Sequence, residues 1–148
     1  MVNITSAITN RDQTLERKAK TIAIQEHSVE GKEAAGFKQR ATDAGRKMVL
    51  GPLDPELNRR TAGVGFSSQK GLLHMPIKAE TKDYEDGVQT GRLLAHQWEL
   101  QNVVLQVGNV YGWTGGIKGS KAADRTNDLL AIVVNEFDSQ EAGPKMIV

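Results

Sequence analysis

The chain has 148 residues, of which 39% are hydrophobic and 25% are charged, a composition typical of one globular domain. Lys and Arg number 19 against 18 Asp and Glu, which excludes a whole-chain basic field, so any contact with nucleic acid must come from a local patch. The lack of cysteine excludes disulfide-linked partners and thiolate metal sites, and it fits an intracellular location. The apolar runs are too short to span a membrane, so we expect no membrane partner.

Hydrophobic patterning in the first third of the chain predicts strands and helices in alternation. Met1–Ile4 predicts the end of a strand, and Asp12–Lys20 predicts a short helix. The apolar run at Thr21–Gln25 predicts a strand that is buried on both faces. A second helix is predicted over residues 34–44 and ends at Gly45, a residue typical of helix carboxyl ends.

The middle of the chain mixes short strands with segments that show no period. Lys47–Leu50 predicts a strand, and the alternation over residues 62–66 predicts another that packs closely on a neighbour. Gly71–Gly91 is polar and aperiodic, so we expect an irregular segment with Lys82–Asp86 in solvent.

The last third predicts a hairpin, a helix and a final strand. These elements are Arg92–Leu100 and Val103–Tyr111 joined by a turn at 101–102, a glycine-rich loop at 112–120, a helix over 122–137 and a strand at Lys145–Val148.

Polar side chains mark the ends of three predicted strands, at Asn3, at Gln25-Glu26-His27 and at Asn109-Val110-Tyr111. Ligand sites of mixed α/β sheets gather at the carboxyl ends of strands. A carboxylate fixed there can hold Mg²⁺, which polarises a phosphoryl oxygen. A tyrosine hydroxyl can bond a phosphate oxygen, and an asparagine can orient a ligand or a water.

Several short motifs occur in the order seen in the endonuclease/exonuclease/phosphatase superfamily, and the chain resembles that family over nearly its whole length. They are VNITS at Val2–Ser6, IAIQEH at Ile22–His27, AGVGFSS at Ala62–Ser68, GRLLAHQWEL at Gly91–Leu100, VVLQVGNVYGW at Val103–Trp113 and DRTNDLLAIVV at Asp124–Val134. The chain is most similar to the endonuclease domains of non-LTR retroelements and to abasic-site endonucleases.

The resemblance implies an α/β fold, a two-sheet sandwich with outer helices. Residues 1–148 would form the amino-terminal portion of one such domain, incomplete at the carboxyl end. It also implies a Mg²⁺-dependent phosphodiesterase, with Mn²⁺ as the alternative ion. The substrate would be DNA, cleaved by an endonuclease that hydrolyses phosphodiester bonds, and the protein would be nuclear if it derives from a retroelement.

By the same resemblance, Glu26 matches the metal-binding glutamate, and Asn3 and Tyr111 match catalytic residues. Arg125 matches an arginine that reaches the substrate phosphate. Thr5 departs from the pattern, because many members carry Asp or Asn at that position.

Alternatives stay open beside this interpretation. The family's Gly-Asp-x-Asn and Ser-Asp-His motifs are expected after Lys145–Val148, so we expect a fragment with near-background hydrolysis. A catalytically inactive remnant that only contacts nucleic acid is the alternative, and RNA or phosphoinositides are alternative substrates. His27 is expected to be a loop residue rather than a ligand, and His74 and His96 are expected to be structural. Trp98 and Trp113 are expected to pack in the core or at its rim rather than to stack bases.

Overall fold

The computed structural model describes residues 2–5, 15, 18–55, 63–113, 121–140 and 143–148, with the backbone alone for residues 2–5. The elements within these residues are β1 (Val2–Thr5), β2 (Thr21–Gln25), α2 (Gly31–Asp43), β3 (Arg46–Leu50), β4 (Gly65–Gln69), β5 (His74–Pro76), α3 (Lys82–Gln89), β6 (Leu93–Leu100), β7 (Val103–Val110), α4 (Lys121–Ser139) and β8 (Lys145–Ile147). The described strands form two four-stranded sheets, ordered β1-β2-β4-β3 and β5-β6-β7-β8.

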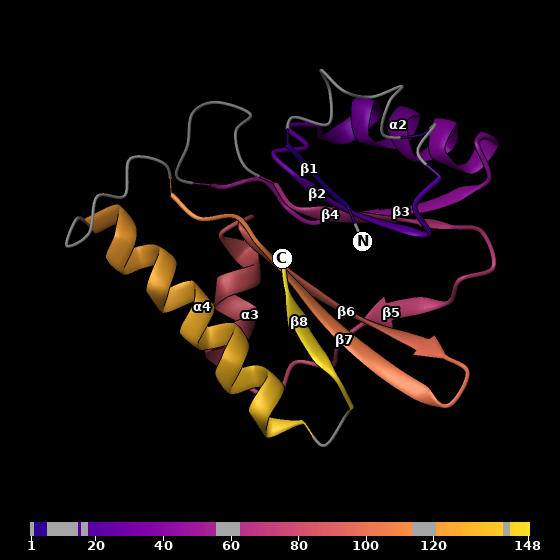
Figure 1. Cartoon of the computed structure of the whole chain (residues 1–148). Coiled ribbons are helices and arrows are strands. Elements are labelled where there is room, and N and C mark those ends of the chain that lie inside the picture. Colours follow the sequence, from indigo (N-terminus) through magenta and orange to yellow (C-terminus); the bar gives the residue numbers. More distant parts are fainter. Residues whose placement is uncertain (1, 6–14, 16–17, 56–62, 114–120, 141–142) are drawn as a thin grey trace.

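The sheet that contains β2 packs α2 on its outer face and the other sheet on its inner face (Figure 1). Alternation along β2 explains this, because successive side chains of a strand point to opposite faces. Ile22 and Ile24 pack against Phe37 of α2, whereas Ala23 packs with Phe66 in the core between the sheets.

The second sheet repeats this arrangement with α3 and α4 on its outer face (Figure 1). Leu93 and Ala95 of β6 pack against these helices in a cluster that includes Val133. Leu94 and Trp98, on the opposite face of the same strand, join the core between the sheets. The layers are therefore helix, sheet, sheet and helix pair, which confirms the predicted two-sheet α/β sandwich with outer helices.

The predicted strand at Thr21–Gln25, the hairpin and the long helix near the carboxyl end are confirmed, the last two as β6–β7 and α4. Most of the helix predicted at Asp12–Lys20 and of the loop predicted at 112–120 lies outside the described residues. No helix in the described part of the chain is long and apolar enough to cross a lipid bilayer.

The prediction that Gly71–Gly91 is irregular is wrong, because this segment contains β5 and α3. Tyr84 is only 4% exposed, so Lys82–Asp86 does not lie wholly in solvent. The Thr81 hydroxyl caps α3 by accepting a hydrogen bond from the Tyr84 backbone N–H over 3.2 Å. Glu136 of α4 accepts two further backbone N–H bonds at this helix end. Because Glu136 is so far from α3 in the sequence, the pattern of residues 71–91 alone does not reveal this helix.

The strand predicted over residues 62–66 begins later than expected, since β4 covers Gly65–Gln69 and Ala62 lies outside the described residues. Ser67 and Ser68 of β4 are fully buried, which their polarity does not indicate. Arg46 explains part of this burial, because its guanidinium donates to the Ser67 hydroxyl over 2.8 Å and to the Ser67 carbonyl over 2.9 Å.

His74 and His96 form a buried pair, which their spacing in the sequence does not predict. Their Nδ1 atoms are 2.9 Å apart, so one ring donates a hydrogen bond to the other. Burial and then the charge of Lys47 lower the pKa of His74 to about 4. Burial, followed by His74 and Lys47, lowers the pKa of His96 to about 3. Both imidazoles are therefore neutral at neutral pH and pack as core residues, in a stack of His74 on Trp98 with ring centroids 5.1 Å apart.

The free energy of unfolding is expected to fall as the pH drops below about 6.5, the ordinary pKa of histidine. Because both folded pKa values are depressed, the unfolded chain binds more protons than the folded chain between about pH 6.5 and 4. Each histidine then contributes a slope of up to about 1.4 kcal/mol per pH unit. Urea unfolding across this pH range measures the slope. A His74→Phe, His96→Leu double variant leaves no unpaired ring nitrogen and should show a shallower slope; an unchanged slope would contradict the assignment.

Candidate active site

Glu26 and Tyr111 meet at the ends of strands from different sheets. Glu26 directly follows β2, and Tyr111 directly follows β7. The Tyr111 hydroxyl donates a hydrogen bond of 2.5 Å to Oε1 of Glu26, across 85 positions of sequence. Both side chains are half-buried. Glu26 and Tyr111 therefore lie together, while their metal-binding and catalytic roles stay predictions.

Two buried amide side chains join the sheets next to this contact. The Gln25 amide Nε2 donates to the carbonyl of Val110 over 2.9 Å. The fully buried Asn109 donates from Nδ2 to two carbonyls of the other sheet, those of Ile24 and Gly65, each at 2.9 Å. These bonds fix the separation of the two strand ends. The sequence signal for this bridge is an amide side chain inside an apolar strand, because a buried amide requires hydrogen-bond partners.

The backbone that carries Glu26 is strained on both sides of His27. Glu26 has a φ of 52° and Ser28 a φ of 53°, a left-handed conformation that costs about 1–2 kcal/mol for each non-glycine residue. His27 anchors this turn: its Nε2 donates to the Gly51 carbonyl over 3.1 Å, and its Nδ1 accepts from the Val29 backbone N–H over 3.2 Å. Burial lowers the pKa of His27 to about 4. The ring is thus a neutral structural anchor of this turn, a role that the sequence analysis does not predict.

Arg92 lies against Tyr111, although the sequence analysis does not single it out. Its Nε donates to Oδ2 of Asp54 over 3.0 Å, in an ion pair whose side chains are 6% and 5% exposed. The Nη1 atom donates to the carbonyl of Gly112 over 3.1 Å. The guanidinium carbon lies 5.3 Å from the centroid of the Tyr111 ring and 4.5 Å from that of Trp113. Arg92 therefore holds the segment that presents Tyr111.

Gly91 allows the loop with Asp54 to approach Arg92. Gly91 has a φ of 70°, and a Cβ at this position would lie 2.5 Å from the backbone carbon of Leu53 and 2.6 Å from the Asp54 nitrogen. A side chain at residue 91 would push this loop away. Nothing in the sequence around Gly91 and Arg92 indicates the ion pair, because Asp54 is 38 positions away.

The structure places the backbone of Asn3 and the side chain of Arg125, and it tests the role of neither. Strand β1 runs parallel to β2 with Asn3 opposite Ala23, so the strands are neighbours as expected. The Asn3 side chain lies outside the described part of the structure, and its catalytic role stays a prediction. Arg125 is exposed on α4, and its guanidinium carbon lies 5.6 Å from the centroid of Trp113. Its contact with phosphate also stays a prediction.

The Tyr111 hydroxyl is a hydrogen-bond donor at neutral pH. Burial, followed by the bond to Glu26 and its charge, raises the pKa of Tyr111 to about 12, and Arg92 partly offsets this effect. No cluster of three or more His, Cys, Asp or Glu side chains suited to a metal occurs among the described residues. The single carboxylate of Glu26 fits a Mg²⁺ ion that keeps several waters, since Mg²⁺ commonly binds through one or two carboxylates.

Comparison with known proteins finds similar structures and no similar sequence. No protein-family model and no curated protein matches the chain. NExo from Neisseria, a 3′ phosphatase solved with a product DNA hairpin, matches with a TM-score of 0.67 at 16% identity. An AP endonuclease from Archaeoglobus fulgidus matches with a TM-score of 0.60 at 16% identity. The catalytic domain of Xenopus laevis APE2 matches with a TM-score of 0.64 at 14% identity. All three are members of the endonuclease/exonuclease/phosphatase superfamily.

The chain has the endonuclease/exonuclease/phosphatase fold. The NExo match covers 99% of this chain and 54% of NExo. The corresponding shares are 94% and 50% for the Archaeoglobus enzyme, and 95% and 54% for APE2. The chain thus spans about half the length of each structure. In this endonuclease/exonuclease/phosphatase fold, the Glu26–Tyr111 contact joins the two sheets at strand ends, the place where α/β sheets bind ligands.

Proposed function

We propose that Glu26 and Tyr111 belong to the active site of a Mg²⁺-dependent phosphodiesterase that acts on DNA, with Mn²⁺ as the alternative ion. The observation that carries this proposal is the 2.5 Å contact between a strand-end carboxylate and a tyrosine hydroxyl. The fold supports it, because the similar structures include a 3′ phosphatase bound to a DNA hairpin and an AP endonuclease.

Each residue of the site has a distinct part in this proposal. The Glu26 carboxylate would hold the ion, and the chemistry that a bound ion would supply is polarisation of a phosphoryl oxygen. Tyr111, whose pKa of about 12 keeps it protonated, serves as a hydrogen-bond donor rather than as a base. Its single O–H donates to the Glu26 carboxylate and so orients it. In a complex with substrate, a phosphate oxygen would be the alternative acceptor for the same O–H. Arg92 holds Tyr111 in place through the ion pair with Asp54.

Metal affinity and DNA cleavage together test this function. Mn²⁺ should broaden the NMR signals of residues around Glu26. In a Glu26→Gln variant, which keeps the shape and removes the charge, the Kd for Mn²⁺ should rise at least about tenfold. Glu99→Gln is the matched control, because Glu99 is exposed on the hairpin. An unchanged Kd in the Glu26→Gln protein would contradict the metal site.

Cleavage of a DNA duplex that contains an abasic site, with and without Mg²⁺, separates the enzyme from the non-enzyme alternative. The expected rate for this chain is near background; any metal-dependent cleavage above that background that disappears in the Glu26→Gln protein supports the phosphodiesterase. DNA binding without cleavage at any metal concentration supports the alternative of a catalytically inactive module that contacts nucleic acid.

A further inference from the structure

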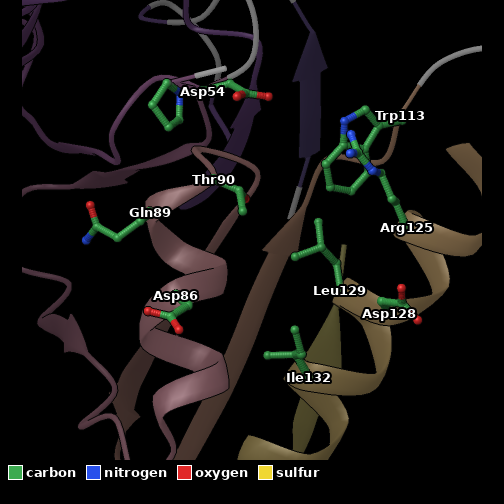
Figure 2. Close-up of a pocket in the computed structure, with 10 residues that line it drawn as sticks. Asp54, Asp86, Gln89, Thr90, Trp113, Arg125, Asp128, Leu129 and Ile132 are labelled. Carbon is green, nitrogen blue, oxygen red and sulfur yellow. The ribbon is translucent and has the colours of Figure 1, made fainter. Parts of the chain in front are cut away.

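A pocket of about 380 Å³ lies next to the candidate active site, between α3 and α4 (Figure 2). Its volume is near the lower end of the range for small-ligand pockets, about 300–1,000 Å³. Leu129 and Ile132 of α4 give it an apolar wall, and Trp113 lies at one end. Asp86 of α3 and Asp128 of α4 line it from opposite sides (Figure 2). The pocket therefore combines flat apolar surface with hydrogen-bond acceptors.

The helices that form the pocket are fixed by buried contacts. Glu136 of α4 holds the amino end of α3 through the backbone N–H and hydroxyl of Thr81. The Tyr84 hydroxyl of α3 accepts a hydrogen bond from the Ala95 backbone N–H of β6 over 3.1 Å. Because these anchors are buried contacts within the chain, they fix the two walls of the pocket, and binding should cost little rearrangement.

Arg92 connects the pocket to the active site. Its ion-pair partner Asp54 lines the pocket, and its guanidinium contacts both Trp113 in the pocket and Tyr111 in the active site. If the reacting phosphate lies at Tyr111, the base of the adjoining nucleotide can therefore reach the pocket.

Trp113 offers a surface on which a base can stack. Buried Arg92 is fixed against the indole, whereas Arg125 is an exposed side chain at 5.6 Å from the ring centroid. An exposed cation–π contact is weak, and base stacking on an aromatic side chain is stronger. A base that stacks on the indole would therefore lie beside the Arg125 guanidinium, which can pair with the nucleotide phosphate.

The two carboxylates select among the bases. A carboxylate only accepts hydrogen bonds, and its two oxygens match two neighbouring N–H donors. The Watson–Crick edge of guanine presents such a pair, at N1 and at the exocyclic N2. The same edge of adenine, cytosine or uracil places an acceptor beside each donor and would face the carboxylate with like partial charge.

We infer that the pocket binds a guanine base of the nucleic-acid substrate, stacked on Trp113 and read by the carboxylate of Asp86 or Asp128. This inference rests on the proposed function in one respect, namely that the base belongs to the nucleic acid that the active site cleaves. The pocket itself can be tested with free nucleotides and without metal.

NMR titration with GMP in the presence of EDTA tests the inference. The chain has two tryptophans, and a Trp113→Phe variant assigns their indole N–H signals. GMP should shift the Trp113 signal and leave that of buried Trp98 unchanged, with a Kd at least about tenfold below those of AMP, CMP and UMP. The Asp86→Asn, Asp128→Asn double variant should abolish this preference, because an amide presents a donor as well as an acceptor, and the two single variants show which carboxylate reads the base. Both aspartates are exposed, so either variant should fold.

Three results would overturn the inference: no shift of the Trp113 signal with any nucleotide, an equal shift with ribose 5-phosphate, or equal affinity for all four nucleotides. The second result would mean that Arg125 captures phosphate alone. Since no metal is present and no bond is cleaved, these results are independent of DNA cleavage. Loss of cleavage in the Glu26→Gln protein with GMP binding intact would separate the two sites.

Discussion

Replacement of Arg92 by alanine is expected to lower the free energy of unfolding by about 3–5 kcal/mol, because it leaves the Asp54 carboxylate buried and without its charged partner. The same change removes hydrogen bonds to the carbonyls of Tyr111 and Gly112. Urea unfolding at neutral pH measures the loss. Arg92→Lys should cost less, since the charge remains while the planar group that donates and stacks is lost.

The matched control for Arg92 is an ion pair at the surface. Lys78 and Glu80 approach to 3.4 Å with side chains 87% and 46% exposed. Lys78→Ala should therefore change the free energy of unfolding by less than about 1 kcal/mol. An Arg92→Ala protein as stable as the Lys78→Ala protein would show that the buried pair does not hold the Tyr111 segment.

Replacement of Glu136 by alanine is expected to cost about 3 kcal/mol and to loosen α3 first. Glu136 is fully buried. Its Oε1 accepts from the backbone N–H of Glu80 over 2.7 Å, and its Oε2 accepts from the Thr81 backbone N–H and hydroxyl over 3.1 and 2.7 Å. Without the carboxylate, three donors at the amino end of α3 lose their partner, and the favourable charge at that helix end is lost.

Hydrogen exchange distinguishes this local effect from general destabilisation. Backbone amides of α3 should lose protection in the Glu136→Ala protein before those of β2 and β4 do. Asp138→Ala is the control on the same helix. The Asp138 side chain is 75% exposed, and its only ion pair among the described residues is with Lys145, at 3.8 Å between Oδ1 and Nζ. Equal loss of protection in α3 and β2 would mean that Glu136 supports the whole fold rather than one wall of the pocket.

These two residues link the active site and the pocket to the same supports. Arg92 contacts the rings of both sites, and Glu136 holds α3, which lines the pocket. A substitution that loosens either support should therefore weaken GMP binding as well as stability. Replacement of Arg92 should lower cleavage more than replacement of Glu136, because Arg92 contacts Tyr111 and Glu136 does not.

The amino-acid sequence by itself determined the elements whose pattern is local. The buried run at Thr21–Gln25, the hairpin of β6 and β7 and the apolar face of α4 each satisfy a period of two or of 3.6 residues within one segment. The ordered motifs that resemble the superfamily also indicated that Glu26 and Tyr111 would lie together. Their strands end at one place because the side-chain amides of Gln25 and Asn109 donate hydrogen bonds to backbone carbonyls of the opposite sheet there.

Only the tertiary structure decided the features that depend on partners far apart in the sequence. Arg92 and Asp54 are 38 positions apart, and the N–H of Glu80 and its acceptor Glu136 are 56 apart. A lone arginine, aspartate or glutamate follows no period, and a polar residue is expected in solvent until a buried partner is known. For the same reason α3 went undetected, since its stability comes from Glu136 and from packing on β6 rather than from its own short sequence.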